Sequence, residues 1–404
     1  MPLDFSHLTE QISIVAKQTE IGRAEATDRS RNALDIIRDA SENYKSLSNK
    51  IEINRRKYTW LVPQINEPLT NAYDPPNIPE NHVVVATDGS QIDVDTHAIT
   101  PWYLLNIGTV NIRYGTNPSA HLQSTPQIYG ADNDLVIVDP ENHLQRETIE
   151  GNLLGYKREV EEVKALIKLI RDIPSDLPIL ALLDGSLVLW GLAGQQFGEY
   201  VRKEIIEDGL LTALEELYNE SKVRPLYVAS YISLPNATEV VNTLRIKICE
   251  FPTPDCDQYC REKPVMERPC DQVAQVLDRH IFQELLQPGQ RSTLFASRSS
   301  VVDKYYGIHR VLFFYLNTGN EIARIEIPQW VAEEEGVNNL HGLLNNQVRL
   351  GNGYPVSLAE AHEQAIVRVS EQDLFWQLVN SKISNTQIQP TTSQKSTAKR
   401  QRWT

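Results

Sequence analysis

Residues 83–90 read Val-Val-Val-Ala-Thr-Asp-Gly-Ser, and residues 179–186 read Ile-Leu-Ala-Leu-Leu-Asp-Gly-Ser. Each stretch is a short apolar run, typical of a buried strand, that ends in an aspartate and a glycine. We therefore expect two buried strands that bring Asp88 and Asp184 to neighbouring strand ends. Asp-Gly is also a common turn dipeptide, so one copy alone would indicate only a turn. Two copies in matching contexts favour a site for a divalent cation, and carboxylate-bound metals commonly serve phosphate chemistry.

The composition is that of a globular protein. The chain has 404 residues, of which 41% are hydrophobic, enough for one large domain or two ordinary ones. No apolar run is long enough to span a bilayer, and the N-terminus lacks the pattern of a secretory signal, so we expect a cytoplasmic protein. The formal net charge of −14 argues against a protein that coats nucleic acid through its overall charge. It does not exclude a nuclease, whose metal site is built from carboxylates.

The apolar patterns predict an α/β fold. Two helices are expected within residues 5–57, followed by a proline-rich linker at 66–80. The next elements are expected to be strands at 83–88, 102–107, 109–113 (after a turn at Gly108) and 135–138, a helix at 153–171, a strand at 179–184, a helix at 197–218 and a strand at 226–232. This order is that of a ribonuclease-H-like mixed sheet flanked by helices.

A C-terminal extension of a β-hairpin and helices is expected after this core. Its elements are a helix at 275–286, strands at 311–316 and 322–327, and a helix at 358–369. In the second of these strands, Arg324 and Glu326 alternate with Ile325 and Ile327, which predicts a sheet with one face in water.

The helix at 153–171 is expected to supply a third carboxylate. If Val163 is the centre of its apolar face, Glu159 lies about 40° away and Glu162 about 100° away, at the edge of that face. Glu161 points outward. This geometry favours Glu159, with Glu162 next, although a helix glutamate is usually a solvated surface residue.

Two further candidates lie near the C-terminus. His362 is on the last expected helix, and Tyr354 lies just before that helix. A neutral imidazole beside a metal site can orient the attacking water or bind the metal. A lone helical histidine is more often structural or exposed, so sequence spacing alone does not single out His362.

The four cysteines, Cys249, Cys256, Cys260 and Cys270, all lie in one short segment. This clustering suggests a structural zinc ion or an iron–sulfur cluster. The sequence has no Cys-x-x-Cys pair, however, and reduced thiols in a variable loop explain the pattern slightly better. Disulfides are not expected in a reducing cytosol.

An ordered set of motifs between residues 80 and 370 resembles the NurA nucleases, DNA-end-processing enzymes of archaea and many bacteria. Any one of these motifs is modest evidence, whereas the ordered set is specific. The motifs are residues 85–90, 181–190, 229–233, 288–292, 311–316, 323–331, 353–355 and 361–362. The cysteine cluster is not among them.

The resemblance implies a ribonuclease-H-like core with Mn²⁺-dependent (or Mg²⁺-dependent) 5′-to-3′ exonuclease and single-strand endonuclease activities. It also implies a homodimer that resects DNA ends in double-strand-break repair with a HerA-type hexameric translocase. The family's metal-binding acids correspond to Asp88, a helix glutamate and Asp184. Its C-terminal tyrosine and histidine correspond to Tyr354 and His362, and the histidine is a further candidate metal ligand.

The resemblance also bears on the helix glutamate. The family's helix motif, an arginine four residues before the acid, fits Arg158 and Glu162. This disagrees with the choice of Glu159 from the helical face. We give Glu162 the preference, because the packing angle between strand and helix is not known from sequence.

We expect three regions along the chain: an N-terminal helical region at 1–65, a nuclease domain at 80–380 and a disordered tail at 381–404. The nuclease domain would comprise a ribonuclease-H-like core at 80–235 and a C-terminal part at 270–380. Two other functions fit the sequence. One is a non-catalytic DNA clamp or adaptor for a translocase, against which the joint presence of Asp88, Asp184 and His362 argues. The other is a metal-dependent nuclease that acts on RNA, since selection of the sugar depends on groove shape.

Overall fold

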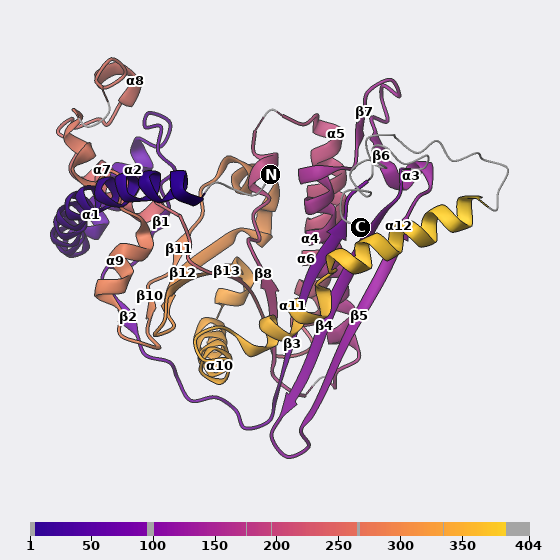
Figure 1. The fold of residues 1–404 in the computed structure, drawn as a ribbon. Helices are drawn as coiled ribbons and strands as arrows, with labels where there is room; N and C mark the ends of the chain where they lie inside the picture. Colours follow the sequence, from indigo (N-terminus) through magenta and orange to yellow (C-terminus); the bar gives the residue numbers. More distant parts are fainter. Residues whose placement is uncertain are drawn as a thin grey trace. The chain divides into compact units, whose positions relative to one another are not determined.

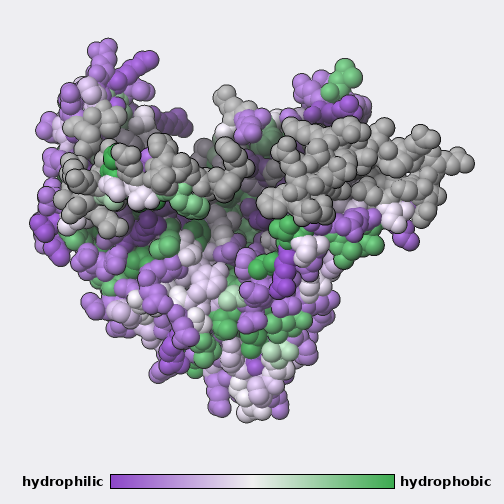
Figure 2. Space-filling view, viewed as in Figure 1, coloured by the Kyte–Doolittle hydropathy of each residue, from purple (hydrophilic) through white to green (hydrophobic). Residues whose placement is uncertain are grey.

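The computed structural model describes residues 5–94, 101–174, 176–194, 196–264, 267–333 and 335–384. The chain forms two compact units, and each is described by itself. The first comprises Met1–Pro75, Ile232–Ser299 and Leu312–Ile325, and the second comprises Pro76–Tyr231, Ser300–Val311 and Glu326–Thr404. The visible surface alternates hydrophilic areas with smaller hydrophobic patches (Figure 2). Among the described helices, none is both long and apolar enough to cross a bilayer.

The first unit packs helices against short strands (Figure 1). Its core includes Phe282, whose ring stacks on Tyr315 with centroids 4.5 Å apart, together with Phe295 and Phe313. Its helices are α1 (Phe5–Glu42), α2 (Tyr44–Ile53), α7 (Glu239–Lys247), α8 (Cys256–Tyr259) and α9 (Asp278–Leu285). Its strands are β1 (Gln64–Ile65), β2 (Ala72–Tyr73), β10 (Arg291–Ser292), β11 (Phe295–Ala296), most of β12 (Val311–Asn317) and the first part of β13 (Ile322–Pro328).

The expectation of a solvent-facing side for β13 is wrong. All seven residues of the strand are buried, and Arg324 is only 2% exposed. In the first unit, Arg324 forms an ion pair with Glu239 (N–O distance 2.7 Å), and its guanidinium lies 3.6 Å from the centroid of the Phe313 ring. The charged positions of this strand therefore mark buried polar contacts, because charged groups are buried only when they are paired.

The second unit contains a five-stranded mixed sheet in the order β9-β8-β3-β4-β5. The strands β3, β4 and β5 form an antiparallel meander, whereas β8 runs parallel to both β3 and β9. Helix α4 precedes β8, and a longer helical segment leads from β8 to β9. The bounds are β3 (His82–Ile92), β4 (Tyr103–Tyr114), β5 (Ser119–Tyr129), α4 (Gly151–Arg171), β8 (Ile179–Asp184) and β9 (Leu226–Ile232). This topology confirms the expected ribonuclease-H-like α/β fold.

Smaller elements complete this part of the second unit. A two-stranded sheet and a one-turn helix lie between β5 and α4, and the helical segment after β8 contains π-helical turns. Their bounds are α3 (Asp132–Leu135), β6 (Val136–Val138), β7 (Arg146–Thr148), α5 (Glu199–Arg202), the π-helical Lys203–Leu211 and α6 (Thr212–Ser221). The expected strand at 135–138 is therefore β6, shortened by one residue.

Two expectations for the meander are wrong. The strands expected at 102–107 and 109–113 are one strand, β4, and Gly108 pairs with Asp88 inside it. A Cβ at Gly108 would lie 2.2 Å from the carbonyl oxygen of Ala361, so this glycine allows close packing of a helix, not a turn. The third strand is β5, which the sequence analysis did not predict; ten of its eleven residues are exposed, and it has no continuous apolar run.

Three helices end the described chain: α10 (Gly336–Leu350), α11 (Val356–Ala365) and α12 (Val369–Ser384). Helix α11 packs against β3 and β4. The helix expected at 358–369 is α11, but its C-terminal bound is wrong, because α11 ends at Ala365 and a separate helix, α12, starts at Val369. Helix α12 extends four residues into the segment expected to be disordered, and residues 385–404 lie outside the described residues.

Candidate active site

Asp88 lies inside β3, not at its end. The strand continues to Ile92, and Asp88 pairs with Gly108 of β4. Pairing with β8 stops where Thr87 meets Leu183, so β8 no longer covers that side of β3 from Asp88 onward. The Oδ1 atom of Asp88 accepts a hydrogen bond from the Gly89 amide at 2.8 Å. The expectation that this Asp-Gly ends the strand is therefore wrong, and the carboxylate lies at an uncovered edge of β3.

Asp184 is the last residue of β8, as expected. Gly185 follows with φ +90°, in the left-handed region that favours glycine, and turns the chain away from the strand. The Ser186 hydroxyl and the Leu187 amide then donate hydrogen bonds to Oε2 of Glu326, at 2.8 and 2.9 Å. This second Asp-Gly is thus a turn that Glu326 holds in place.

Glu162 reaches the same edge of β3 from α4. The Thr87 hydroxyl donates to the carbonyl oxygen of Glu162 at 3.1 Å, and Arg158 Nε donates to Glu162 Oε1 at 3.0 Å. Gly89 makes room for this carboxylate, because a Cβ there would lie 2.4 Å from Glu162 Oε1. Glu162 is 3% exposed. Since successive strand residues point to opposite faces, Asp88 and the carboxylate that packs over Gly89 approach the edge from opposite faces of β3.

Glu159 lies on the same helix but does not belong to its fully buried set, which includes Glu162. Burial nevertheless raises the pKa of Glu159 to about 7, and the Arg158 guanidinium opposes this rise. The ranking from the helical face, with Glu159 first, therefore does not match the burial. The reason is Gly89, whose missing side chain lets the strand accept Glu162 at the edge of the apolar face.

His362 and Tyr354 contact the two aspartates. Nδ1 of His362, on α11, lies 2.7 Å from Asp88 Oδ2, and the His362 side chain is 61% exposed. The Tyr354 hydroxyl donates to Asp184 Oδ1 at 3.4 Å. Its ring packs edge-on against Tyr231, with centroids 5.1 Å apart. The structure thus places His362 on Asp88 and Tyr354 on Asp184.

The carboxylates of the site are electrostatically coupled. Burial raises the pKa of Asp184 above its ordinary value, the charge of Asp88 adds to this rise, and Tyr354 and His362 oppose it. Burial also raises the pKa of Glu162 well above its ordinary value, with Arg158 opposing and Asp88 adding to the rise. A divalent cation would relieve this crowding of negative charge.

The site fits Mn²⁺ or Mg²⁺ by donor type and charge, because both ions prefer carboxylate oxygens. Within the described ranges, no three His, Cys, Asp or Glu side chains are already grouped closely enough to hold one metal ion. Arg158 instead holds Glu162, and His362 holds Asp88. A bound cation would therefore take over the contact that Arg158 now makes with Glu162, and it would share Asp88 with His362.

Glu326 is the residue of this region whose role the sequence did not reveal. It is fully buried, and its Oε2 accepts the two hydrogen bonds from the loop after Asp184. The alternation of charged and apolar residues in β13 is visible in the sequence, but it predicted a face of the sheet in contact with water. A buried acid is retained only with polar partners, and here those partners lie next to a candidate catalytic aspartate.

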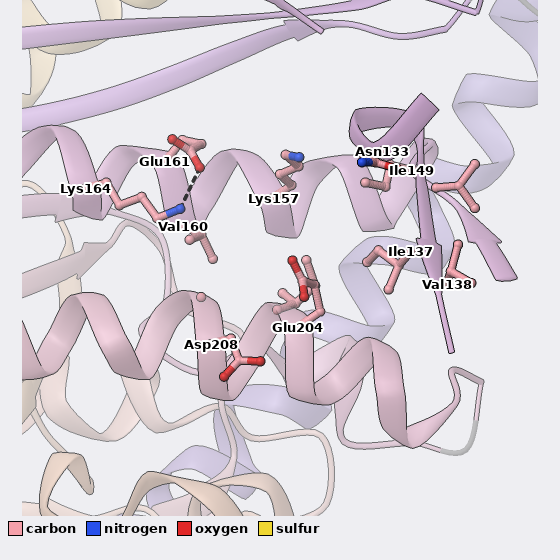
Figure 3. Close-up of a pocket in the computed structure, with 13 residues that line it drawn as sticks. Asn133, Ile137, Val138, Ile149, Lys157, Val160, Glu161, Lys164, Glu204 and Asp208 are labelled. Atoms are coloured by element: carbon pink, nitrogen blue, oxygen red, sulfur yellow. Dashed lines mark hydrogen bonds and ion pairs between the residues drawn. The ribbon is translucent and has the colours of Figure 1, made fainter. Parts of the chain in front are cut away.

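A separate cavity of about 330 Å³ lies between α4, β6 and the π-helical segment. Figure 3 shows Lys157 and Glu161 of α4 across from Glu204 and Asp208. Lys164 pairs with Glu161 at 2.9 Å, so acids and bases are mixed here. The acids of the candidate site do not line this cavity, and its mixed charge does not suit a second cation site.

A protein-family model described as the NurA domain matches residues 82–367. No curated protein matches the chain. Among solved structures, prototype foamy virus protease–reverse transcriptase is 14% identical with a TM-score of 0.22, and the match covers 39% of this chain but only 18% of the viral one. A DNA complex of endonuclease V from Ciona intestinalis is 10% identical with a TM-score of 0.33, over 83% of this chain and 98% of that one. Neither structural likeness is strong enough to carry an argument.

Proposed function

The chain belongs to the NurA family of nucleases, and from that premise we propose that it is a metal-dependent DNA nuclease. Its activities would be a 5′-to-3′ exonuclease and a single-strand endonuclease that depend on Mn²⁺ or Mg²⁺. The observation that supports the proposal is that Asp88 lies near enough to both Glu162 and Asp184 for its charge to raise the pKa of each. These acids come from a strand, a helix and a second strand, with His362 and Tyr354 beside them.

The bound metal ion would activate water and neutralise the charge that develops on the phosphate. Asp88, Glu162 and Asp184 would hold this ion. Asp88 Oδ2 also fixes the ring of His362 through Nδ1. Nε2 of that ring is then the nitrogen that can exchange a proton with water or with the leaving oxygen.

Tyr354 and Arg158 have supporting roles in this proposal. The Tyr354 hydroxyl contacts Asp184 Oδ1 and can orient that carboxylate or donate to a phosphate oxygen. The Arg158 guanidinium offsets the charge of buried Glu162, and it would approach the DNA backbone once the carboxylate turns to the cation.

The proposal extends to the biological setting. We propose that the protein resects DNA ends in double-strand-break repair, as a homodimer with a HerA-type hexameric translocase. The motif resemblance supports this setting. The net charge of −14 also fits an enzyme that is brought to DNA by a partner, because an acidic protein gains little from general attraction to phosphate. Co-purification with the translocase encoded in the same genome would test it.

The decisive experiment is cleavage of linear DNA labelled at the 5′ or the 3′ end, single- and double-stranded, with Mn²⁺, Mg²⁺ or chelator. The wild type is compared with Asp184→Asn, which keeps the shape of the side chain but removes its charge. We expect Mn²⁺-dependent loss of the 5′ label in the wild type and none in the variant. Circular dichroism and thermal unfolding of both proteins serve as the control for folding.

Other outcomes would overturn the proposal. DNA binding without cleavage under any metal, also with the translocase present, would identify a clamp. Faster cleavage of a matched RNA would identify a ribonuclease. Unchanged cleavage by Asp184→Asn would place the active site elsewhere.

A further inference from the structure

All four cysteines of the chain line one small cavity in the first unit. Cys249 follows α7, Cys256 and Cys260 bracket α8, and Cys270 belongs to the 3₁₀ turn Pro269–Val273. Three segments thus bring every thiol to one place. Packing alone does not require this, because a buried thiol behaves as a small apolar side chain that any core position can accept.

Helix α8 places two of the thiols on one face. The Cys260 amide donates to the Cys256 carbonyl at 3.0 Å, which is the hydrogen bond of a helical turn. Residues four apart on a helix are neighbours on its surface, so Cys-x-x-x-Cys on a helix can act as a chelating pair.

Two positive side chains and one carboxylate, that of Asp255, line the same cavity. Arg245 and Arg268 line it together with the thiols. Arg245 also donates to Asp271 Oδ1 at 2.9 Å, which fixes the turn that carries Cys270 against the end of α7. A divalent ion together with four thiolate ligands has a net charge of about −2. The arginines are placed to compensate it.

Of the described residues between Cys249 and Cys270, only Pro254 is buried. Helix α8 is four residues long, and none of its residues is buried. The main ring contact is the stacking of Phe251 on Tyr259, with centroids 4.1 Å apart. A metal–thiolate cross-link is the usual means of fixing such a short, irregular segment.

We propose that Cys249, Cys256, Cys260 and Cys270 bind one zinc ion, as a structural site separate from the carboxylate site. The cavity has a volume of about 20 Å³. A single water-sized particle needs about 10–15 Å³, so the space suits one ion and not a four-iron cluster. In the described residues the sulfurs are not yet grouped as a metal-binding set. Zinc binding would therefore draw the loop inward and order it.

The test is metal analysis of the full-length protein, purified without chelator from medium that supplies both zinc and iron. We expect about one zinc per chain in the wild type and none in Cys260→Ser. The matched control is Asp184→Asn, which should lose nuclease activity but keep its zinc. Limited proteolysis between residues 249 and 270 should be faster in Cys260→Ser than in this control.

If the Cys260→Ser variant does not fold, a second measurement on the wild type tests the proposal. Titration of the wild type with a mercurial thiol reagent should release zinc to a colorimetric chelator as the four thiols react. Four freely reactive thiols without zinc, iron with acid-labile sulfide, or thiols lost to disulfides would each overturn the proposal. So would zinc that remains bound in a folded Cys260→Ser variant.

Discussion

The two Asp-Gly-Ser segments have the same sequence and different structures. Asp88-Gly89-Ser90 continues β3, whereas Asp184-Gly185-Ser186 ends β8 in a turn. Gly89 is needed because α4 lies against it, and a Cβ would meet Glu162. Gly185 has nothing within 4 Å of its Cβ position and is needed for its φ of +90°. One sequence motif thus satisfies two different physical constraints.

The serines differ in the same way. Ser90 donates to the carbonyl of Ala365 at the end of α11. Ser186 donates to buried Glu326 and accepts hydrogen bonds from the Val188 amide and from Trp190 Nε1, at 3.0 and 3.1 Å. The first serine joins a strand to a helix, and the second organises a loop. A repeated motif can therefore occur in two different backbone settings.

The largest effect on cleavage is expected from replacing the aspartate of either Asp-Gly-Ser segment. Asp88→Asn and Asp184→Asn should each reduce cleavage at least about 100-fold, because each removes a charge that would hold the cation. Single-turnover cleavage rates with Mn²⁺ measure the loss, and thermal unfolding tests the fold. Substantial activity in only one variant would show that the two aspartates do not share one site.

Alanine substitutions of Gly89 and Gly185 should have different effects, because one glycine makes room for Glu162 and the other adopts a positive φ. Gly89→Ala forces Glu162 and Arg158 to move, so we expect at least about tenfold slower cleavage and an overpacking loss of about 1–3 kcal/mol in unfolding free energy. Gly185→Ala should cost about 1 kcal/mol through its positive φ, with a smaller effect on rate. Denaturant unfolding and cleavage assays on both variants test this. Equal rate losses would contradict the distinction.

Glu326→Gln tests whether Glu326 holds the loop after Asp184, in the second Asp-Gly-Ser segment. The glutamine keeps the shape but removes the charge, so the hydrogen bonds that Ser186 and Leu187 donate to this side chain should weaken and the loop after Asp184 should be held less firmly. We expect kcat to fall about tenfold with KM little changed. Because KM and kcat are measured separately, a rise in KM alone would instead indicate that Glu326 affects DNA binding.

The smallest effects are expected from the serines. Ser90→Ala and Ser186→Ala should each lower the unfolding free energy by about 1 kcal/mol, with Ser186→Ala the more costly because it removes a donor to buried Glu326. Paired denaturant titrations measure the difference. If Ser90→Ala were the more destabilising, the link between β3 and α11 would outweigh the loop contacts.

The sequence was sufficient where a pattern had one physical cause. The apolar runs before Asp88 and Asp184, and the periodicity of α4, predicted the parallel strands and the helix between them. The long β4–β5 hairpin was not predicted, because β5 lacks the continuous apolar run by which the buried strands were recognised. The ranking of Glu159 and Glu162 depended on a glycine in another element, and the buried charges of β13 depended on partners far along the chain.

The packing of α11 on β4 has an evolutionary consequence. The amide of Asn106 donates to the carbonyls of Gln364 and Ala365, at 3.1 and 2.8 Å, and Gly108 lies under the helix backbone. The orientation of the His362 ring therefore depends on contacts that the α11 main chain makes with β4. A single substitution at Gly108, which is far from His362 in the sequence, would shift α11 and so move the His362 ring out of place. Selection on His362 would then appear as selection on a strand glycine.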